Sequence, residues 1–139
     1  FPGKSINEGF ARSAIASFAA QLDPTLSEVN DIKTAVSEGV TNCIVHAYKD
    51  SIGEVYIKTS IFDDGVFEIK IRDKGCGIED IEKAKEPLFT TGGSERSGMG
   101  FTIMESFMDS CKVSSKPGKG TTVVMRKRIK PKVNGKSIL

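Results

Sequence analysis

The 139-residue sequence predicts an α+β fold, a two-layer sandwich with helices on one face of a mixed or antiparallel sheet. Its first third repeats apolar residues every three to four positions, which indicates helices. The period then changes to two, which indicates strands. Since no internal repeat or linker divides the chain, we expect a single domain over residues 1–139.

The first helix is expected over residues 6–22, where apolar residues recur at every fourth position. They are Ile6, Phe10, Ala14, Phe18 and Leu22. Arg12 lies roughly opposite this stripe, so we expect it on the surface. Asp23-Pro24 ends the helix, and Ser27 is expected to be the N-cap of a second helix that runs to about residue 47.

The second half of the chain predicts two hairpins separated by a loop and a helix. Strands are expected over residues 55–62 and 66–72, joined by a turn at Asp63-Asp64-Gly65. The later elements are a loop over 85–98, a third helix after Gly100, a short strand over 112–115 and a long strand over 121–129. A long loop inside a compact domain is typical of a functional or a mobile segment.

Composition excludes several classes of protein. Lys and Arg total 20 and Asp and Glu total 18, and a net charge of +2 does not indicate a nucleic-acid or membrane surface. Cys43, Cys76 and Cys111 form no CxxC pair, which argues against a disulfide framework or a zinc site. We find no signal peptide and no apolar run of membrane-spanning length, so we expect a cytoplasmic location.

Glu38 and Asn42 are the first candidate site. They are four residues apart on the second helix, so they lie one turn apart on its polar face. A carboxylate and an amide oxygen in this arrangement suit a general base and a hard cation. The alternative is a pair that is solvated on the polar side of an amphipathic helix.

Asp73-Lys74-Gly75-Cys76-Gly77 is the second candidate, directly after a strand. It is either an ordinary turn at a strand end or a site where Asp73 accepts a hydrogen bond from an exocyclic amine such as that of adenine. Gly75 and Gly77 would then let the backbone approach a flat ring. Thr122, on the last strand, would supplement Asp73 if the two strands are neighbours.

Ser97-Gly98-Met99-Gly100 is the third candidate, at the start of the third helix. Glycines at a helix N-terminus expose backbone N–H groups at its positive end, where phosphate binds readily. A plain junction between loop and helix is the alternative. Neither the Rossmann fingerprint nor the P-loop spacing is satisfied.

In order, the chain reads E-x-x-x-N, D-x-G-x-G, G-x-G and G-x-G-T. This series resembles the four boxes of the GHKL ATP-binding fold over roughly residues 38–122. The segments Ser37–Tyr48, Glu86–Thr91 and Glu95–Gly100 are similar to the bacterial anti-sigma serine kinases, and more to their sporulation branch than to their general-stress branch.

The resemblance implies a double function. The protein would bind and inhibit a sigma factor of RNA polymerase, and it would phosphorylate a serine on an anti-anti-sigma protein. A homodimer is also implied, without direct contact to nucleic acid or membrane. The alternatives are an ATP-gated binding protein with little catalysis and a histidine-kinase fragment. His46 is the single histidine, but it lies on the same helix as Asn42, so a partner serine is the better acceptor.

The resemblance also implies roles for individual residues. Glu38 would be the general base, Asn42 the Mg²⁺ ligand, and Asp73 the residue that reads the adenine of ATP or ADP. The other implied nucleotide contacts are Gly75, Gly77, Ile78, Arg96, Gly98, Met99, Gly100 and Thr122. Arg96 would contact the γ-phosphate and Arg12 a protein partner, and a solvated arginine is the alternative for both.

Overall fold

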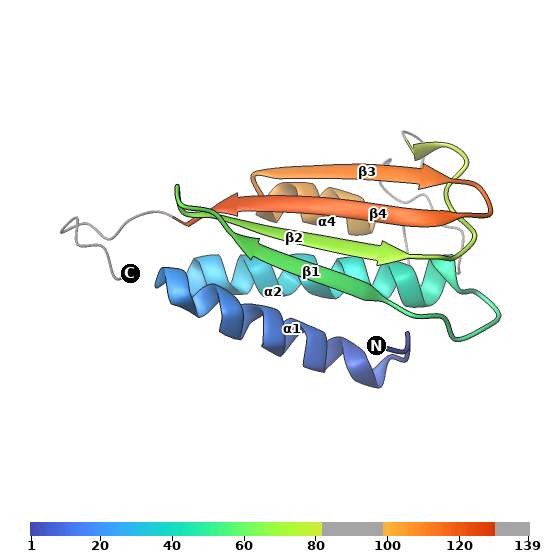
Figure 1. Ribbon diagram of the computed structural model, residues 1–139, viewed down its shortest axis with the longest axis horizontal. Helices are drawn as coiled ribbons and strands as arrows, with labels where there is room; N and C mark the ends of the chain where they lie inside the picture. Colours follow the sequence, from blue (N-terminus) through green and yellow to red (C-terminus); the bar gives the residue numbers. More distant parts are fainter. Residues whose placement is uncertain (82–98, 130–139) are drawn as a thin grey trace.

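The computed structural model describes residues 1–81 and 99–129. Within these residues the strands form one four-stranded sheet, and every pairing is antiparallel. The helices lie together on one face of this sheet (Figure 1). The predicted two-layer α+β fold is therefore confirmed, in its antiparallel form.

The helical elements are α1 (Ile6–Ala19), a 3-10 turn (Ala20–Leu22), α2 (Leu26–Thr41), a π-helical turn η2 (Asn42–Ala47) and α4 (Met99–Phe107). The strands are β1 (Tyr56–Ile61), β2 (Val66–Asp73), β3 (Ser110–Lys116) and β4 (Gly120–Arg128), in the spatial order β1-β2-β4-β3. Because β4 lies next to β2, Asp73 at the end of β2 pairs with Thr121 near the start of β4. None of the helices described is long and apolar enough to cross a membrane.

The buried face of the first helix is only partly the predicted one, because Phe18 and Leu22 pack against the core whereas the earlier residues of the stripe do not. Ile6 and Phe10 are 83% and 67% exposed, and Ala14 is exposed as well. The buried side chains of α1 are Ala11, Ile15, Ala16 and Ala19. Alanines let α1 pack closely against α2, so close packing rather than the size of the apolar residues selects the face.

The N-terminus of α2 also differs from the expectation, because Thr25 rather than Ser27 is the N-cap. Thr25 Oγ1 accepts a hydrogen bond from the Glu28 backbone N–H at 3.1 Å, and Glu28 Oε1 accepts one from the Thr25 backbone N–H at 2.8 Å. This reciprocal capping box needs Glu or Gln three residues after the cap. Ser27 is followed at that distance by Asn30, so it offers no such partner.

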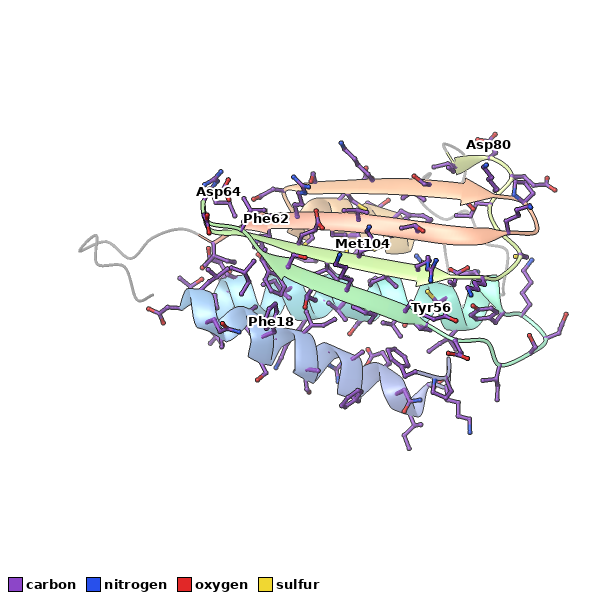
Figure 2. All side chains as sticks on the ribbon, viewed as in Figure 1. Phe18, Tyr56, Phe62, Asp64, Asp80 and Met104 are labelled. Carbon is purple, nitrogen blue, oxygen red and sulfur yellow. The ribbon has the colours of Figure 1, made fainter. Side chains whose placement is uncertain are left out.

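Helix α2 lies close to β2 because Gly39 has no side chain. A Cβ atom at Gly39 would lie 2.5 Å from Ile71 Cδ1 and 3.7 Å from Met104 Sδ. Met104 belongs to the buried core and Phe18 packs against it (both labelled in Figure 2), and the Phe18 ring lies 5.9 Å from the Phe67 ring. The close approach brings the C-terminal end of α2 next to the end of β2.

Two glycines of the β3–β4 turn allow a prediction about stability. Gly118 and Gly120 both have positive φ, +77° and +108°. A Cβ at Gly118 would have nothing within 4 Å, whereas one at Gly120 would lie 2.8 Å from Lys74 Cα and would meet the Asp73 carbonyl oxygen. We expect Gly120→Ala to lower the free energy of unfolding by about 3 kcal/mol and Gly118→Ala by about 1 kcal/mol. Urea unfolding followed by circular dichroism measures both; equal losses would mean that the contact with β2 contributes nothing.

Candidate functional site

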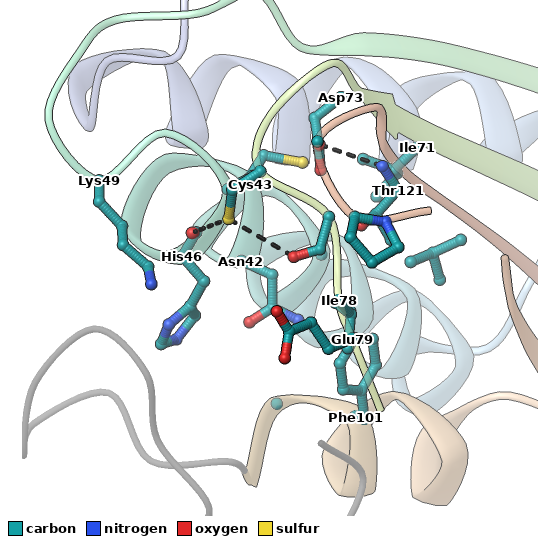
Figure 3. A pocket seen from close by; sticks show the side chains of 18 of the residues that line it. Asn42, Cys43, His46, Lys49, Ile71, Asp73, Ile78, Glu79, Phe101 and Thr121 are labelled. Atoms are coloured by element: carbon teal, nitrogen blue, oxygen red, sulfur yellow. Dashed lines mark hydrogen bonds between the residues drawn. The ribbon is translucent and has the colours of Figure 1, made fainter. Parts of the chain in front are cut away.

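A cavity of about 700 Å³ lies where five segments meet (Figure 3). Its walls come from the end of α2, from η2, from the end of β2 with the loop after it, from the start of α4 and from the β3–β4 turn. In Figure 3, Asp73 and Thr121 lie at the upper side of the cavity, Asn42 in the middle and Phe101 at the lower side. The volume suits a ligand the size of a nucleotide.

The first and third candidate motifs face each other at the lower side of this cavity. A Cβ atom at Gly100 would lie 3.1 Å from Asn42 Oδ1 and 3.4 Å from Glu38 Oε2. Asn42 and Gly100 line the cavity, and the Glu38 carboxylate lies beside Gly100. Met99 begins α4, so the backbone of this helix start faces the Glu38–Asn42 turn. The expected contacts Arg96 and Gly98 lie outside the described residues.

Asn42 is also where the backbone of the long helix changes. Helix α2 ends at Thr41, and the wider π-helical turn η2 starts at Asn42. Such turns occur frequently at functional sites. The Ala47 carbonyl at the end of η2 accepts a hydrogen bond from the Cys76 backbone N–H at 3.0 Å, which ties η2 to the loop after β2.

A close contact between two backbone segments requires glycine at position 75, and the sequence did not indicate this contact. A Cβ atom at this position would meet the Ala47 backbone, and Gly75 is not among the residues that line the cavity. Gly77 does line the cavity, but its φ is +76° and its Cβ would meet the Lys116 carbonyl. Both glycines therefore permit close contacts within the protein. The expected approach of a ring stays a prediction for Gly77, which lines the cavity, and Gly75 lies outside the lining.

Asp73 is held by backbone donors at the upper side of the cavity. It is 5% exposed, and its Oδ1 accepts hydrogen bonds from the backbone N–H groups of Gly75 at 2.9 Å and Thr121 at 3.2 Å. Burial raises the pKa of Asp73 above its usual value, although these hydrogen bonds and one from Cys43 act in the opposite direction. A buried carboxylate with acceptor capacity left is suited to bind a ligand N–H group.

Thr121, and not Thr122, is the hydroxyl residue that accompanies Asp73. Side chains alternate between the faces of a strand, and Thr121 is buried on the helix side whereas Thr122 lies on the opposite face. Only Thr121 of the two lines the cavity. The prediction of Thr122 was wrong by one residue. The period of two locates the strand in the sequence, but it does not show which face of the strand is turned toward the helices.

Ile78 lines the cavity, as expected from the sequence. Its backbone N–H donates to Ser115 Oγ at 2.8 Å, and the same hydroxyl group lies 2.8 Å from Thr121 Oγ1. The Gly118 backbone N–H donates to the Cys76 carbonyl at 2.6 Å. The β3–β4 hairpin therefore fixes the loop after β2 and holds Ile78 at the cavity.

Several cavity residues were not assigned a role from the sequence. Among them are Cys43, His46, Lys49, Cys76 and Phe101. Lys49 follows Asn42 by seven residues, close to two helical turns, and this spacing would have predicted its position. Cys43 was interpreted as a small core residue, and its place in the buried core confirms this; it is 3% exposed, it also lines the cavity together with Asp73, and burial raises the pKa of its thiol.

The residues present fit a cation that is coordinated mainly by phosphate oxygens and water, with few protein side chains. Asn42 Nδ2 is a buried atom without a hydrogen-bond partner among the described residues, so this side-chain amide is not committed to the protein interior. The described part of the chain contains no group of three or more His, Cys, Asp or Glu side chains that could hold a metal ion. Mg²⁺ typically uses one or two protein ligands together with phosphate oxygens and water, which agrees with this donor set.

Comparisons with known proteins define the class to which this fold and cavity belong. Residues 4–127 match the histidine kinase-like ATPase domain. The histidine kinase domain of the blue-light activated kinase of Erythrobacter litoralis superposes with a TM-score of 0.61 at 22% identity. That match covers 88% of this chain and 61% of the kinase domain, and it concerns the fold alone.

Closer relatives narrow the class. The chain is 58% identical over 130 residues to the anti-sigma F factor of Caldanaerobacter subterraneus subsp. tengcongensis, a match that covers 93% of this chain and 90% of the relative. It is 56% identical over 131 residues to that of Halalkalibacterium halodurans, covering 93% and 89%. The chain therefore belongs to the anti-sigma F factor family of histidine kinase-like ATPase domains.

Proposed function

We propose that the protein is an anti-sigma factor of the sigma-F type that binds Mg²⁺ and ATP and phosphorylates a serine of an anti-anti-sigma protein. The observation that carries the nucleotide part is that Asp73, Asn42 and Gly100 line one cavity. The names of the relatives support the sigma-factor part. Our proposal includes a cytoplasmic homodimer, for which Ile6 and Phe10 on α1 offer exposed apolar surface.

ATP would lie with its base at Asp73 and its phosphates toward the start of α4. Asp73 accepts a hydrogen bond from the adenine amine, and Thr121 and Ile78 border the base. The backbone N–H groups at Met99 and Gly100 would bind phosphate, since they belong to the first turn of α4, at its positive end. Asn42 would hold Mg²⁺, which when bound neutralises charge on the phosphates.

Glu38 would act on the proton of the incoming serine. Its Oε2 lies beside Gly100, so it is near the position proposed for the terminal phosphate. The carboxylate takes the proton from the serine hydroxyl as the serine oxygen bonds to the γ-phosphorus, and ADP leaves with the electrons of the broken P–O bond. Arg96 would neutralise charge on the γ-phosphate in this arrangement.

The test uses the purified protein with labelled ATP, Mg²⁺ and the sigma and anti-anti-sigma proteins of the same organism. We expect a stable complex with the sigma factor and acid-stable phosphate on a serine of the anti-anti-sigma protein. Binding of ATP and sigma factor without phosphate transfer would support a nucleotide-gated binding protein instead. Acid-labile phosphate would indicate histidine chemistry and contradict the proposal.

Arg12 is the residue that we propose for contact with the sigma factor. Its Nη1 lies 3.3 Å from Glu8 Oε1 and 3.4 Å from Ser37 Oγ, and its side chain is 43% exposed. We expect Arg12→Ala to weaken sigma binding about tenfold, because a charged hydrogen bond contributes about 1.5–3 kcal/mol. ATP affinity should stay within about twofold, since Arg12 does not line the cavity and its partly exposed ion pair with Glu8 contributes little to stability.

The matched control for this prediction is Arg72→Ala. Arg72 is exposed near the end of β2, on the sheet face opposite the helices, where it lies over the Tyr56 ring. The Arg72→Ala substitution should leave both sigma binding and ATP binding unchanged. If calorimetry gives the same sigma affinity for Arg12→Ala as for wild type, Arg12 is only a partly solvated residue of α1.

A further inference from the structure

The face of the sheet opposite the helices carries a strong excess of positive charge. The helices lie together on the other face (Figure 1), and side chains alternate along each strand, so the positions between the buried ones point away from the helices. The whole chain has a net charge of only +2, so its basic residues are concentrated on this open face. The charged strand residues of the open face are Lys58, Lys70, Arg72, Lys112, Lys116, Arg126, Arg128 and a single carboxylate, Glu68.

Three of these lysines lie in one row that crosses all four strands, which we call the lysine row. Lys58 on β1 is paired with Lys70 on β2, and Lys70 is paired with Val124 on β4. Val124 is in turn paired with Lys112 on β3. None of the three lysines forms an ion pair with another residue in the described part of the chain.

The lysine row is unfavourable for the sheet itself. Like charges directly opposite each other destabilise a strand pair, and Lys58 and Lys70 stand in this position. Lysines on edge strands discourage pairing between molecules, which accounts for Lys58 and Lys112. It does not account for Lys70, because β2 is an internal strand. Residues that break a local rule of this kind are expected at functional sites.

We propose that the lysine row, with Val124 within it, is a docking surface for an acidic helix of a partner protein. The row lies on the opposite side of the sheet from the helices, and thus from Arg12, so the proposal goes beyond the function proposed above. It also does not depend on the nucleotide, since none of the lysines lines the cavity.

The spacing of the row fits a helix laid across the strands. Neighbouring strands are about 4.8 Å apart, so Lys70 and Lys112 lie about 5 and 14 Å from Lys58 along the row. Acidic residues at positions i, i+3 and i+10 of a helix lie on one face, at about 0, 4.5 and 15 Å along its axis. An apolar residue at i+7, at about 10.5 Å, would meet Val124.

The neighbouring rows favour a protein helix over a polyanion. The carboxylate of Glu68 stands in the next row, where its Oε2 lies 2.8 Å from Arg126 Nη2. Nucleic acid or an anionic membrane would cover several rows and would meet this carboxylate, whereas a helix contacts one row. Arg72 lies over the Tyr56 ring at 4.7 Å, so the two arginines are already engaged within the face.

The test uses calorimetry at low salt with a synthetic helical peptide that carries Glu at i, i+3 and i+10 and Leu at i+7. The control peptide has the same composition, but its Glu residues are moved by two positions, onto the opposite face of the helix. We expect the first peptide to bind at least about tenfold more tightly than the control. Joint replacement of Lys58, Lys70 and Lys112 by Gln should weaken it about 20-fold, because an exposed ion pair contributes up to about 1 kcal/mol.

The matched protein variant replaces Lys4, Lys33 and Lys119 by Gln, which removes the same charge outside the row. It should bind the peptide within about twofold of wild type. Equal binding of the two peptides, or equal losses in the two triple variants, would overturn the proposal in favour of unspecific attraction. Tighter binding of phosphatidylserine vesicles or of a DNA duplex would overturn it in favour of a membrane or nucleic acid. Self-association that only the row variant loses would identify a second copy as the occupant instead.

Lys70→Glu separates docking from a structural role. The new carboxylate stands opposite Lys58, so the urea midpoint should rise at low salt, and the gain should shrink in about 1 M salt, where charges are screened. Peptide binding should fall further than in Lys70→Gln, because a repulsion is added. A lower urea midpoint together with weaker binding would show that Lys70 supports the sheet, and it would overturn the proposal.

Discussion

Asp73→Asn is expected to weaken ATP binding about 100-fold. The acceptor that faces the adenine amine is replaced by a donor, and this buried donor is left without a partner. The Gly75 and Thr121 backbone N–H groups both require an acceptor, so the amide oxygen of the new side chain must point to them. The amide NH₂ group then faces the cavity, where the adenine amine is also a donor. Calorimetry with ATP measures the loss.

The same substitution is expected to stabilise the nucleotide-free protein at neutral pH. Burial raises the pKa of Asp73, so the folded state holds this proton more tightly than the unfolded state. Its contribution to stability is therefore present below the usual pKa of 3.8 and is lost as the pH rises through the raised value. An amide has no such loss, so the urea midpoint of Asp73→Asn relative to wild type should rise with pH across this window.

Asp80→Asn is the control, since Asp80 also lines the cavity but is exposed at its rim. The Asp80→Asn substitution should leave ATP affinity unchanged. Wild-type ATP affinity in Asp73→Asn would reduce Asp73 to a residue that only closes the turn after β2.

Glu38→Gln is expected to reduce phosphate transfer by about 10²–10⁴-fold, the usual contribution of a general base. The amide keeps the size of the side chain but cannot take a proton from the serine hydroxyl. ATP affinity should stay within about threefold, because Asn42, Asp73 and the start of α4 make the proposed nucleotide contacts. Single-turnover transfer of labelled phosphate to the anti-anti-sigma protein separates the chemical step from binding.

Glu79→Gln is the matched control for this change. Glu79 is another carboxylate that lines the cavity, but it is exposed and lies after β2 rather than on α2. Transfer by this variant should remain within a few-fold of wild type. Unchanged transfer in Glu38→Gln would show that Glu38 is not the general base.

The periodicity of the sequence predicted the elements of the fold well, because the backbone sets a period of two in strands and of about 3.6 in helices. It predicted less well which of two adjacent faces is buried. On α1, Phe10 and Ala11 both belong to apolar series, and only packing against α2 decides for Ala11. Thr121 and Thr122 pose the same problem on β4, where identical residues stand on opposite faces.

Contacts between distant segments were beyond the reach of the sequence. Gly75 and Gly77 are separated from Ala47 and Lys116 by many residues, so nothing in the local pattern shows that these backbones touch. Cys43 carries no signal of its own, since a small apolar residue in a helix is usually part of the core. Its place at the cavity together with Asp73 depends on where η2 passes β2.

The glycine contacts at the cavity have a consequence for how a base is selected there. In three places a glycine brings main chain directly against main chain. The pairs are Gly75 with Ala47, Gly77 with Lys116, and Gly120 with Asp73. Main-chain walls do not change with side-chain rotamers, so this end of the cavity has its shape before a ligand arrives, and little ordering entropy is lost on binding. Exchange of neighbouring side chains should therefore change the outline of this end of the cavity little, whereas recognition of the polar groups of the base still depends on Asp73.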